Sequence, residues 1–284
     1  EFVLDYHGKI GNDFSYNIAG NISTYKNKVL SLGGGTNIPG KTHLGNQVNT
    51  MIEPGKPIGY FYGYKMDGVF QTQEEINNYR GGPDNTIIMP TAEPGDLKFV
   101  DLNGDGKLGE EDRTMIGNPH PDFTFGLTLS GEYKGFDLSM FFQGSVGNDI
   151  LNILKYDIYS GTGWYNAPKD IFDKFWTGPG STNENFAISA NSRDNLTMSE
   201  WYIENGSYVR LKNVTLGYTF PKQWVQKLTV QNLRLFVAAQ NLFTITSYSG
   251  LDPELGNSNP AFMGIDMGWY PQARSFMVGL SLKL

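Results

Sequence analysis

An acidic twelve-residue segment, 101–112, carries the sharpest chemical motif in the sequence. Its spacing matches the D-x-[DN]-x-[DN]-G-x5-E pattern of a calcium loop, with Asp in place of the final Glu. Gly106 would supply the sharp bend, and oxygen ligands would come from Asp101, Asn103, Asp105, the Lys107 carbonyl and Asp112. We expect a bound Ca²⁺, or Mg²⁺ because the shorter Asp112 favours a smaller ion. The alternative is an Asx-rich turn whose side chains cap their own backbone.

A second candidate site is the aromatic-rich segment 148–205. Aromatic faces there can stack on sugar rings or pack against a protein partner. The alternative, which we favour for most of them, is that the aromatics build a small core of their own. The candidate ligand or partner contacts are Trp164, Tyr165, Trp176 and Trp201, of which Trp164 and Tyr165, set among Gly and Asn, are the strongest.

Catalytic signals are poor. The three histidines are scattered, there is no cysteine, and no nucleophile elbow or phosphate loop is present. We therefore expect no enzyme. The net charge of −7 also argues against a nucleic-acid partner.

The elements that must position these segments are strands, because apolar and polar residues alternate with a period of two. Segment 121–133 shows this best, and 136–147 follows it after the tight Lys134-Gly135 turn. In 207–220, Arg210 and Lys212 interrupt the apolar face. The expected strands are 1–10, 13–26, 121–133, 136–147, 207–220, 233–246 and 273–284.

The lengths of these strands and of their connections predict a membrane barrel. About eleven residues tilted by about 40° rise roughly 28 Å, enough for the apolar band of an outer-membrane barrel. Short turns alternate with long links at 27–120, 148–206 and 247–272, which is typical of periplasmic turns and extracellular loops. Seven strands leave two unpaired edges, so we expect further strands upstream. The rival interpretation is a soluble, calcium-stabilised, carbohydrate-binding β-sandwich.

Several stretches go beyond architecture, among them 94–106 (PGDLKFVDLNGDG), 116–119 (IGNP), 208–218 (YVRLKNVTLGY) and 250–254 (GLDPE). In order and over nearly the whole chain, they closely resemble the C-terminal barrel region of the SusC/RagA family of TonB-linked outer-membrane proteins. One departure is Leu284, where many outer-membrane barrels end in Phe.

The resemblance implies an all-β fold, namely the last seven or so strands of a ~22-stranded transmembrane antiparallel barrel with long extracellular loops. It implies an N-terminal plug and a TonB box that lie outside this sequence. It also implies TonB-energised uptake of oligosaccharides or peptides across the bacterial outer membrane. The expected partners are a SusD-like surface lipoprotein lid, TonB, outer-membrane lipid and the glycan or peptide substrate.

Overall fold

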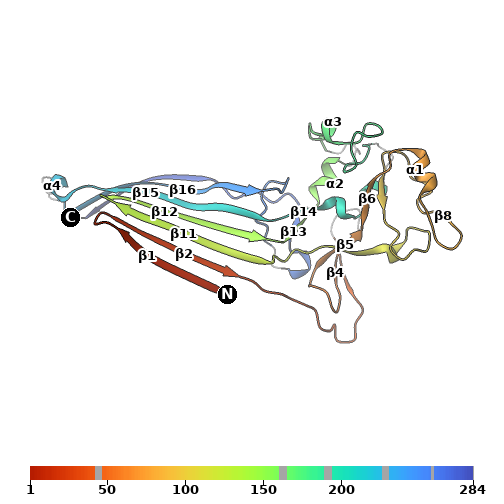
Figure 1. Cartoon of the computed structure of the whole chain (residues 1–284), viewed down its shortest axis with the longest axis horizontal. Helices are drawn as coiled ribbons and strands as arrows, with labels where there is room; N and C mark the ends of the chain where they lie inside the picture. Colours follow the sequence, from red (N-terminus) through yellow and green to blue (C-terminus); the bar gives the residue numbers. More distant parts are fainter. Residues whose placement is uncertain (42–46, 160–164, 189–193, 226–229, 257–258, 284) are drawn as a thin grey trace.

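Seven long strands form one antiparallel sheet in the computed structural model, which describes residues 1–41, 47–159, 165–188, 194–225, 230–256 and 259–283 (Figure 1). Each strand pairs with its neighbours in sequence order, so the sheet is a meander. Its strands are, in order across the sheet, β1 (Phe2–Ile10), β2 (Phe14–Ser23), β11 (Phe123–Tyr133), β12 (Phe136–Val146), β15 (Tyr208–Thr219), β16 (Asn232–Thr246) and β18 (Ser275–Lys283).

The connections fall into two groups at opposite ends of this sheet (Figure 1). The tightest is the β11–β12 turn, where Lys134 and Gly135 both have positive φ, 47° and 90°. A two-residue hairpin turn of type I′ requires this backbone conformation, because it matches the twist of the two strands. The short helix α4 (Lys222–Val225) follows β15 at the same end. The three long links all leave the sheet at the other end.

Strand β15 contains a bulge that corrects the expectation of an interrupted apolar face. Its pairing with β12 steps from Phe141↔Asn213 to Phe142↔Leu211, which leaves Lys212 as an extra residue. A bulge of this kind shifts the side-chain alternation by one residue. Leu211 therefore joins the apolar face, while Arg210 points to the polar one. Strand β16 has a matching irregularity: its pairing with β15 steps from Asn213↔Gln240 to Leu211↔Phe243, and Asn241 between them has a φ of +50°.

The three long links fold together into an outer domain, which we define as the described residues of 24–122, 147–207 and 247–274. It holds a four-stranded sheet, a three-stranded sheet and two two-stranded ones. These are β3 (Ile38–Lys41), β4 (Val48–Ile52), β5 (Tyr60–Tyr64) and β10 (Arg113–Gly117); β13 (Asp149–Asn152), β14 (Ile203–Asn205) and β17 (Ile265–Asp266); β6 (Met66–Val69) with β9 (Leu97–Phe99); and β7 (Arg80–Gly81) with β8 (Thr86–Ile87). Its helices are α1 (Gln73–Asn78), α2 (Leu154–Tyr159) and α3 (Ile171–Lys174).

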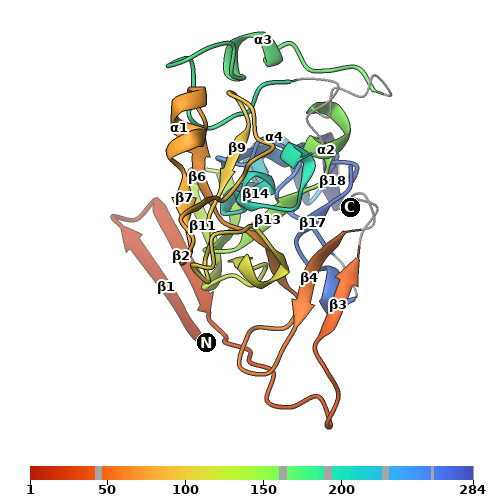
Figure 2. The same cartoon turned by 90° about the vertical axis from the view of Figure 1, so that its right-hand side faces the viewer.

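Contacts between the links make the outer domain one body rather than three separate loops. β13 of the second link pairs in parallel with β17 of the third, through Leu151↔Ile265. A β-bridge joins Tyr64 of the first link to Ser199 of the second. One buried apolar cluster draws on all three links and includes Phe61, Leu151 and Ile265. Seen along the long axis, the outer domain lies across one end of the sheet (Figure 2). None of the described helices is long and apolar enough to cross a membrane.

Candidate functional site

One face of the seven-stranded sheet is apolar and exposed. The register aligns Val237 with Val278 and Leu235 with Leu280 across β16 and β18. Phe276 is 73% exposed and Val278 75%. Among the described residues no second sheet covers this face. A β-sandwich buries such a face against another sheet, so the structure disfavours the soluble alternative.

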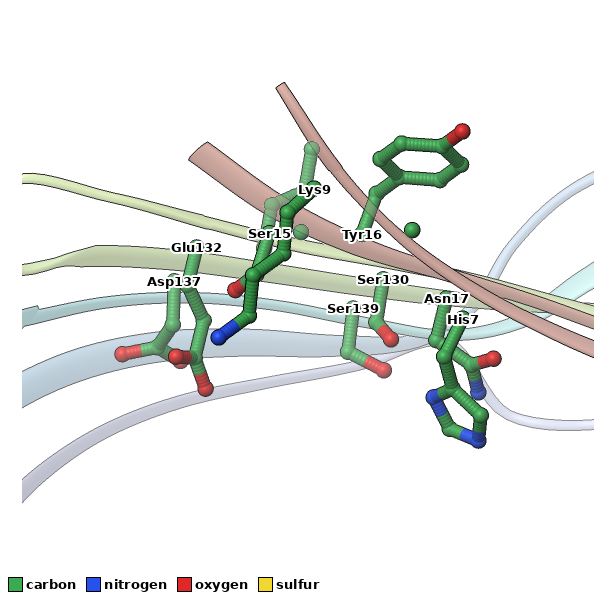
Figure 3. A pocket seen from close by; sticks show the side chains of 12 residues that line it. His7, Lys9, Ser15, Tyr16, Asn17, Ser130, Glu132, Asp137 and Ser139 are labelled. Atoms are coloured by element: carbon green, nitrogen blue, oxygen red, sulfur yellow. The ribbon is translucent and has the colours of Figure 1, made fainter. Parts of the chain in front are cut away.

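The other face is polar and forms an open hollow of about 480 Å³ near the short turns (Figure 3). Four side chains form a row across four strands, because His7 lies opposite Asn17, Asn17 opposite Ser130 and Ser130 opposite Ser139. Figure 3 shows these side chains on one side of the sheet and Tyr16 on the other. The row offers amide, imidazole and hydroxyl groups to water.

Charged residues on the polar face lie closer to the turns. Glu132 lies directly opposite Asp137 in the β11–β12 hairpin, a pairing of like charges that costs stability when it is uncompensated. Arg234 on β16 compensates it, because its Nε donates to Asp137 Oδ2 over 2.8 Å and its Nη2 donates to Oδ1. The pair is bidentate, which gives it a defined geometry. Arg234 thus offsets one of the two neighbouring negative charges on the polar face.

Where β15 meets the outer domain, Arg210 is the centre of a buried ionic cluster. Its side chain is 4% exposed. Its Nε donates to Thr244 Oγ1 and its Nη1 to Glu254 Oε2, both over 2.7 Å, and its Nη2 donates to Asp252 Oδ1. Lys212 binds the same Glu254 carboxylate over 2.8 Å. This ionic cluster, Arg210, Lys212, Asp252 and Glu254, attaches the third link to the sheet.

Asp252 is the acidic centre of the ionic cluster. Burial raises the pKa of its carboxyl group, but the hydrogen bond from Arg210 and those from the backbone N–H groups of Gln272 and Glu254 outweigh it. The net result is a pKa below the ordinary value of an aspartate. The carboxylate therefore stays ionised, and its loss would leave Arg210 buried without its closest partner. Breaking a buried pair in this way costs about 3–5 kcal/mol.

Sequence reasoning missed this ionic cluster. The signal was present, because Arg210 and Lys212 stand in a strand that is otherwise apolar, and Asp252 and Glu254 lie in a stretch noted only for its family resemblance. What joins them is the bulge in β15, which places both bases on the polar face.

The acidic segment 101–112 forms a compact loop whose carboxylates accept bonds from backbone amides. Asp112 is fully buried, and its Oδ2 accepts from Gly109 N over 2.7 Å and its Oδ1 from Leu102 N over 2.9 Å. Asp101 accepts from Gly104 N and Gly106 N, over 2.7 and 2.8 Å. Asn103 and Asp105 make Asx turns to Asp105 N and Lys107 N. These bonds are those of the Asx-rich turn; the described residues show no group of three acidic, His or Cys side chains arranged to hold a metal. The cation stays a prediction.

The four aromatic candidates have different surroundings. Trp201 is 5% exposed, and its ring packs against Phe186 with centroids 4.9 Å apart. Its Nε1 donates to Asn185 Oδ1 over 3.0 Å, and Trp176 Nε1 likewise donates to Gln71 Oε1 over 3.1 Å. Tyr165 is 63% exposed, so its ring is open to solvent. Trp164 lies outside the described residues.

The whole chain is similar in sequence to TonB-dependent receptors. No family model matches it. The chain is 36% identical to TonB-dependent receptor P3 of Formosa agariphila, with 100% of this chain and 28% of the relative aligned. It is 27% identical to TonB-dependent receptor SusC of Bacteroides thetaiotaomicron, over 100% of this chain and 26% of the relative. The chain is SusC/RagA-like.

The solved structure of the RagAB peptide transporter has the same fold over 99% of this chain, with a TM-score of 0.74 at 20% identity. This SusC/RagA-like chain spans 28% of that protein's length. The likeness confirms the expected all-β fold. Together with the TonB-dependent receptors among the sequence relatives, it indicates a segment of an outer-membrane barrel of that kind. Its exposed apolar face is therefore the lipid face, and its polar face lines the lumen. The relatives are receptors rather than enzymes, as the sequence predicted.

Proposed function

We propose that this chain forms part of the wall and the outer vestibule of a nutrient importer that takes up oligosaccharides or peptides across the outer membrane. The single observation that carries the proposal is the pairing of an exposed apolar face with a hydrated lumen face on one sheet. That arrangement suits a water-filled passage through lipid. One similar structure is described as a peptide transporter, and the family resemblance of the sequence implies oligosaccharides or peptides, so both substrate classes stay within the proposal.

The outer domain is the proposed vestibule. It lies at the end of the sheet where the long links leave, and long loops of such barrels are extracellular. Its shared core and the ionic cluster hold it in a fixed place on the wall. We propose that a SusD-like lipoprotein lid docks on its exposed side, and that Tyr165 is among the residues that meet the lid or the substrate. Energy from TonB would act through parts of the receptor outside this segment.

A divalent cation at Asp101–Asp112 belongs to the same proposal. A carboxylate has about four lone-pair sites, so the bonds to backbone amides leave room for a cation on the same oxygens. The role would be to stiffen the loop against the β7–β8 hairpin, to which Thr86 Oγ1 already connects it by donating to the Gly106 carbonyl over 2.9 Å.

Uptake by the complete receptor tests the import proposal. A strain that lacks the receptor, and the same strain carrying it, would be given labelled oligosaccharide and oligopeptide mixtures, with and without a protonophore. We expect receptor-dependent uptake of one class that the protonophore abolishes. Equal uptake of both classes in the two strains would refute the proposal. A photo-cross-linking residue in place of Tyr165, with Trp201 as the buried control position, would capture the lid.

A further inference from the structure

The lipid face of the sheet contains an apolar groove of about 280 Å³ near the short turns. It lies over β11 and β12, and one wall comes from β2. Its principal lining residues are Phe14, Leu129, Gly131, Phe136, Leu138 and Met140.

Gly131 forms part of the groove floor: a Cβ there would stand 3.3 Å from the Phe14 ring, which borders the gap without lying over the glycine. Two other glycines of the lipid face lie under aromatic rings, since a Cβ on Gly8 would be 2.3 Å from Tyr16 and one on Gly144 would be 2.3 Å from Phe125. Aromatic cover of this kind is a common way to fill the gap beside a strand glycine. Tyr16 is the cross-strand neighbour of Gly131, but its ring lies over Gly8 instead.

The positively charged side chain of Lys134 lies at one end of the groove. Tyr133 borders the groove, and Lys134 Nζ lies 5.3 Å from the centroid of the Tyr133 ring. The Lys134 side chain is 59% exposed and only loosely paired, with Asp13 at 3.4 Å. Because short turns of such barrels are periplasmic, Lys134 is placed at the headgroup level of the periplasmic leaflet, which consists of phospholipid. A lysine at that level attracts anionic headgroups.

We propose that this groove binds one acyl chain of a periplasmic-leaflet phospholipid, with the headgroup phosphate beside Lys134. A lipid chain seated on Gly131 fills the gap beside the Phe14 ring, and it packs against β2, β11 and β12 together. The inference goes beyond import: it depends on the sheet lying in a membrane and not on which nutrient the receptor carries.

Native mass spectrometry of the complete receptor in detergent tests the proposal, with phosphatidylglycerol added as the probe. Gly131→Leu fills the groove, and Gly20→Leu is the matched control. Gly20 lies on the same lipid face, but its Cβ would meet only Gly126 O at 3.7 Å and Leu127 at 3.8 Å. We expect Gly131→Leu to retain about tenfold less phospholipid, the effect of losing roughly two buried methylene contacts. Gly20→Leu should retain as much as the unchanged receptor.

Equal retention in all three proteins would overturn the proposal, as would an equal loss in both variants or a bound lipoprotein chain in place of phospholipid. Lys134→Gln should weaken retention of phosphatidylglycerol more than that of phosphatidylethanolamine, whose own ammonium partly neutralises the phosphate; no change with either lipid would refute the headgroup position. Heat-dependent gel migration checks that each barrel is folded. If Gly131→Leu does not assemble, Gly131→Ala takes its place. Its methyl group is smaller but still narrows the groove, because it would stand 3.3 Å from the Phe14 ring. Uptake assays are separate, so failure of this proposal leaves the import proposal standing.

Discussion

The sheet and the outer domain use the same apolar residue types in opposite ways. Phe61 and Phe70 of the outer domain are fully buried, whereas Phe276 on β18 is 73% exposed. Water surrounds the outer domain, so its aromatics must cover one another. Lipid surrounds the sheet, so its apolar side chains need no cover, and only its backbone must be fully paired. Burial within the chain therefore marks the core of one region and not of the other.

Truncation of an aromatic should separate the two regions most strongly. Trp201→Ala removes a buried ring that packs against Phe175, Phe186 and Tyr202, and we expect a loss of about 3–5 kcal/mol in the stability of the outer domain. Phe276→Ala, the matched change on the lipid face, should leave the outer domain intact. Limited proteolysis of the complete receptor in membranes measures both. Equal resistance of the two variants would break the comparison.

The ionic cluster joins the two regions, so its removal should detach one from the other. Arg210→Ala leaves Asp252 buried without its guanidinium partner, at a cost of about 3–5 kcal/mol. We expect faster cleavage within 247–274 and an unchanged barrel on heat-dependent gel migration. A Lys212→Ala control, which keeps Asp252 paired, should change cleavage less. If Arg210→Ala and Lys212→Ala behave alike, Arg210 is not the centre of the attachment.

The same cluster predicts a pH dependence. The Asp252 pKa is lower in the folded protein than in an unfolded chain, so its contribution to stability is complete above the ordinary aspartate pKa. The contribution is lost as the pH falls through the lowered value. Proteolysis of 247–274 should therefore accelerate in acid, and Asp252→Asn should flatten the profile. A profile of unchanged shape in Asp252→Asn would show that another group titrates.

A charge on the sheet should act differently on its two faces. Val278→Lys puts an ammonium on the lipid face, at a cost of about 2–4 kcal/mol at the bilayer midplane. Met277→Lys puts it on the lumen face of the same strand, opposite the uncharged Ala238, and should cost much less. Urea unfolding in lipid vesicles compares the free energies of unfolding of the two variants. A similar cost for both would mean that the faces are not in different solvents.

The smallest expected effect concerns the acidic loop. Asp101→Ala with Asp105→Ala removes side chains that cap backbone amides, at about 1 kcal/mol for each bond. We expect loosening confined to residues 95–118, seen as faster cleavage there, together with loss of bound Ca²⁺ or Mg²⁺ by elemental analysis. Unchanged cation content with a looser loop would leave the Asx-rich turn as the complete description. If neither changes, the loop has no such role.

The long strands were predictable because their signal is local. In 121–147, strict alternation and the Lys134-Gly135 turn specify strand, register and face together. The bulge at Lys212 was not predictable, because it appears only when β15 is aligned with both neighbours. The small strands of the outer domain also escaped, since pairs such as Leu151↔Ile265 join short segments far apart in sequence. The composition of 148–205 predicted that its aromatics build a small core. It did not predict that residues of all three links share one buried apolar cluster.

Solvent access to the two faces of β18 shows directly whether one face of the sheet meets lipid and the other meets water. The sequence contains no cysteine, so Leu280→Cys and Ser281→Cys in the complete receptor each place one thiol in this segment. Intact outer membranes would be treated with a water-soluble maleimide and the β18 peptide examined by mass spectrometry. We expect the thiol at 281 to react and the thiol at 280 to stay protected by lipid. Equal labelling, or labelling at 280 alone, would contradict it.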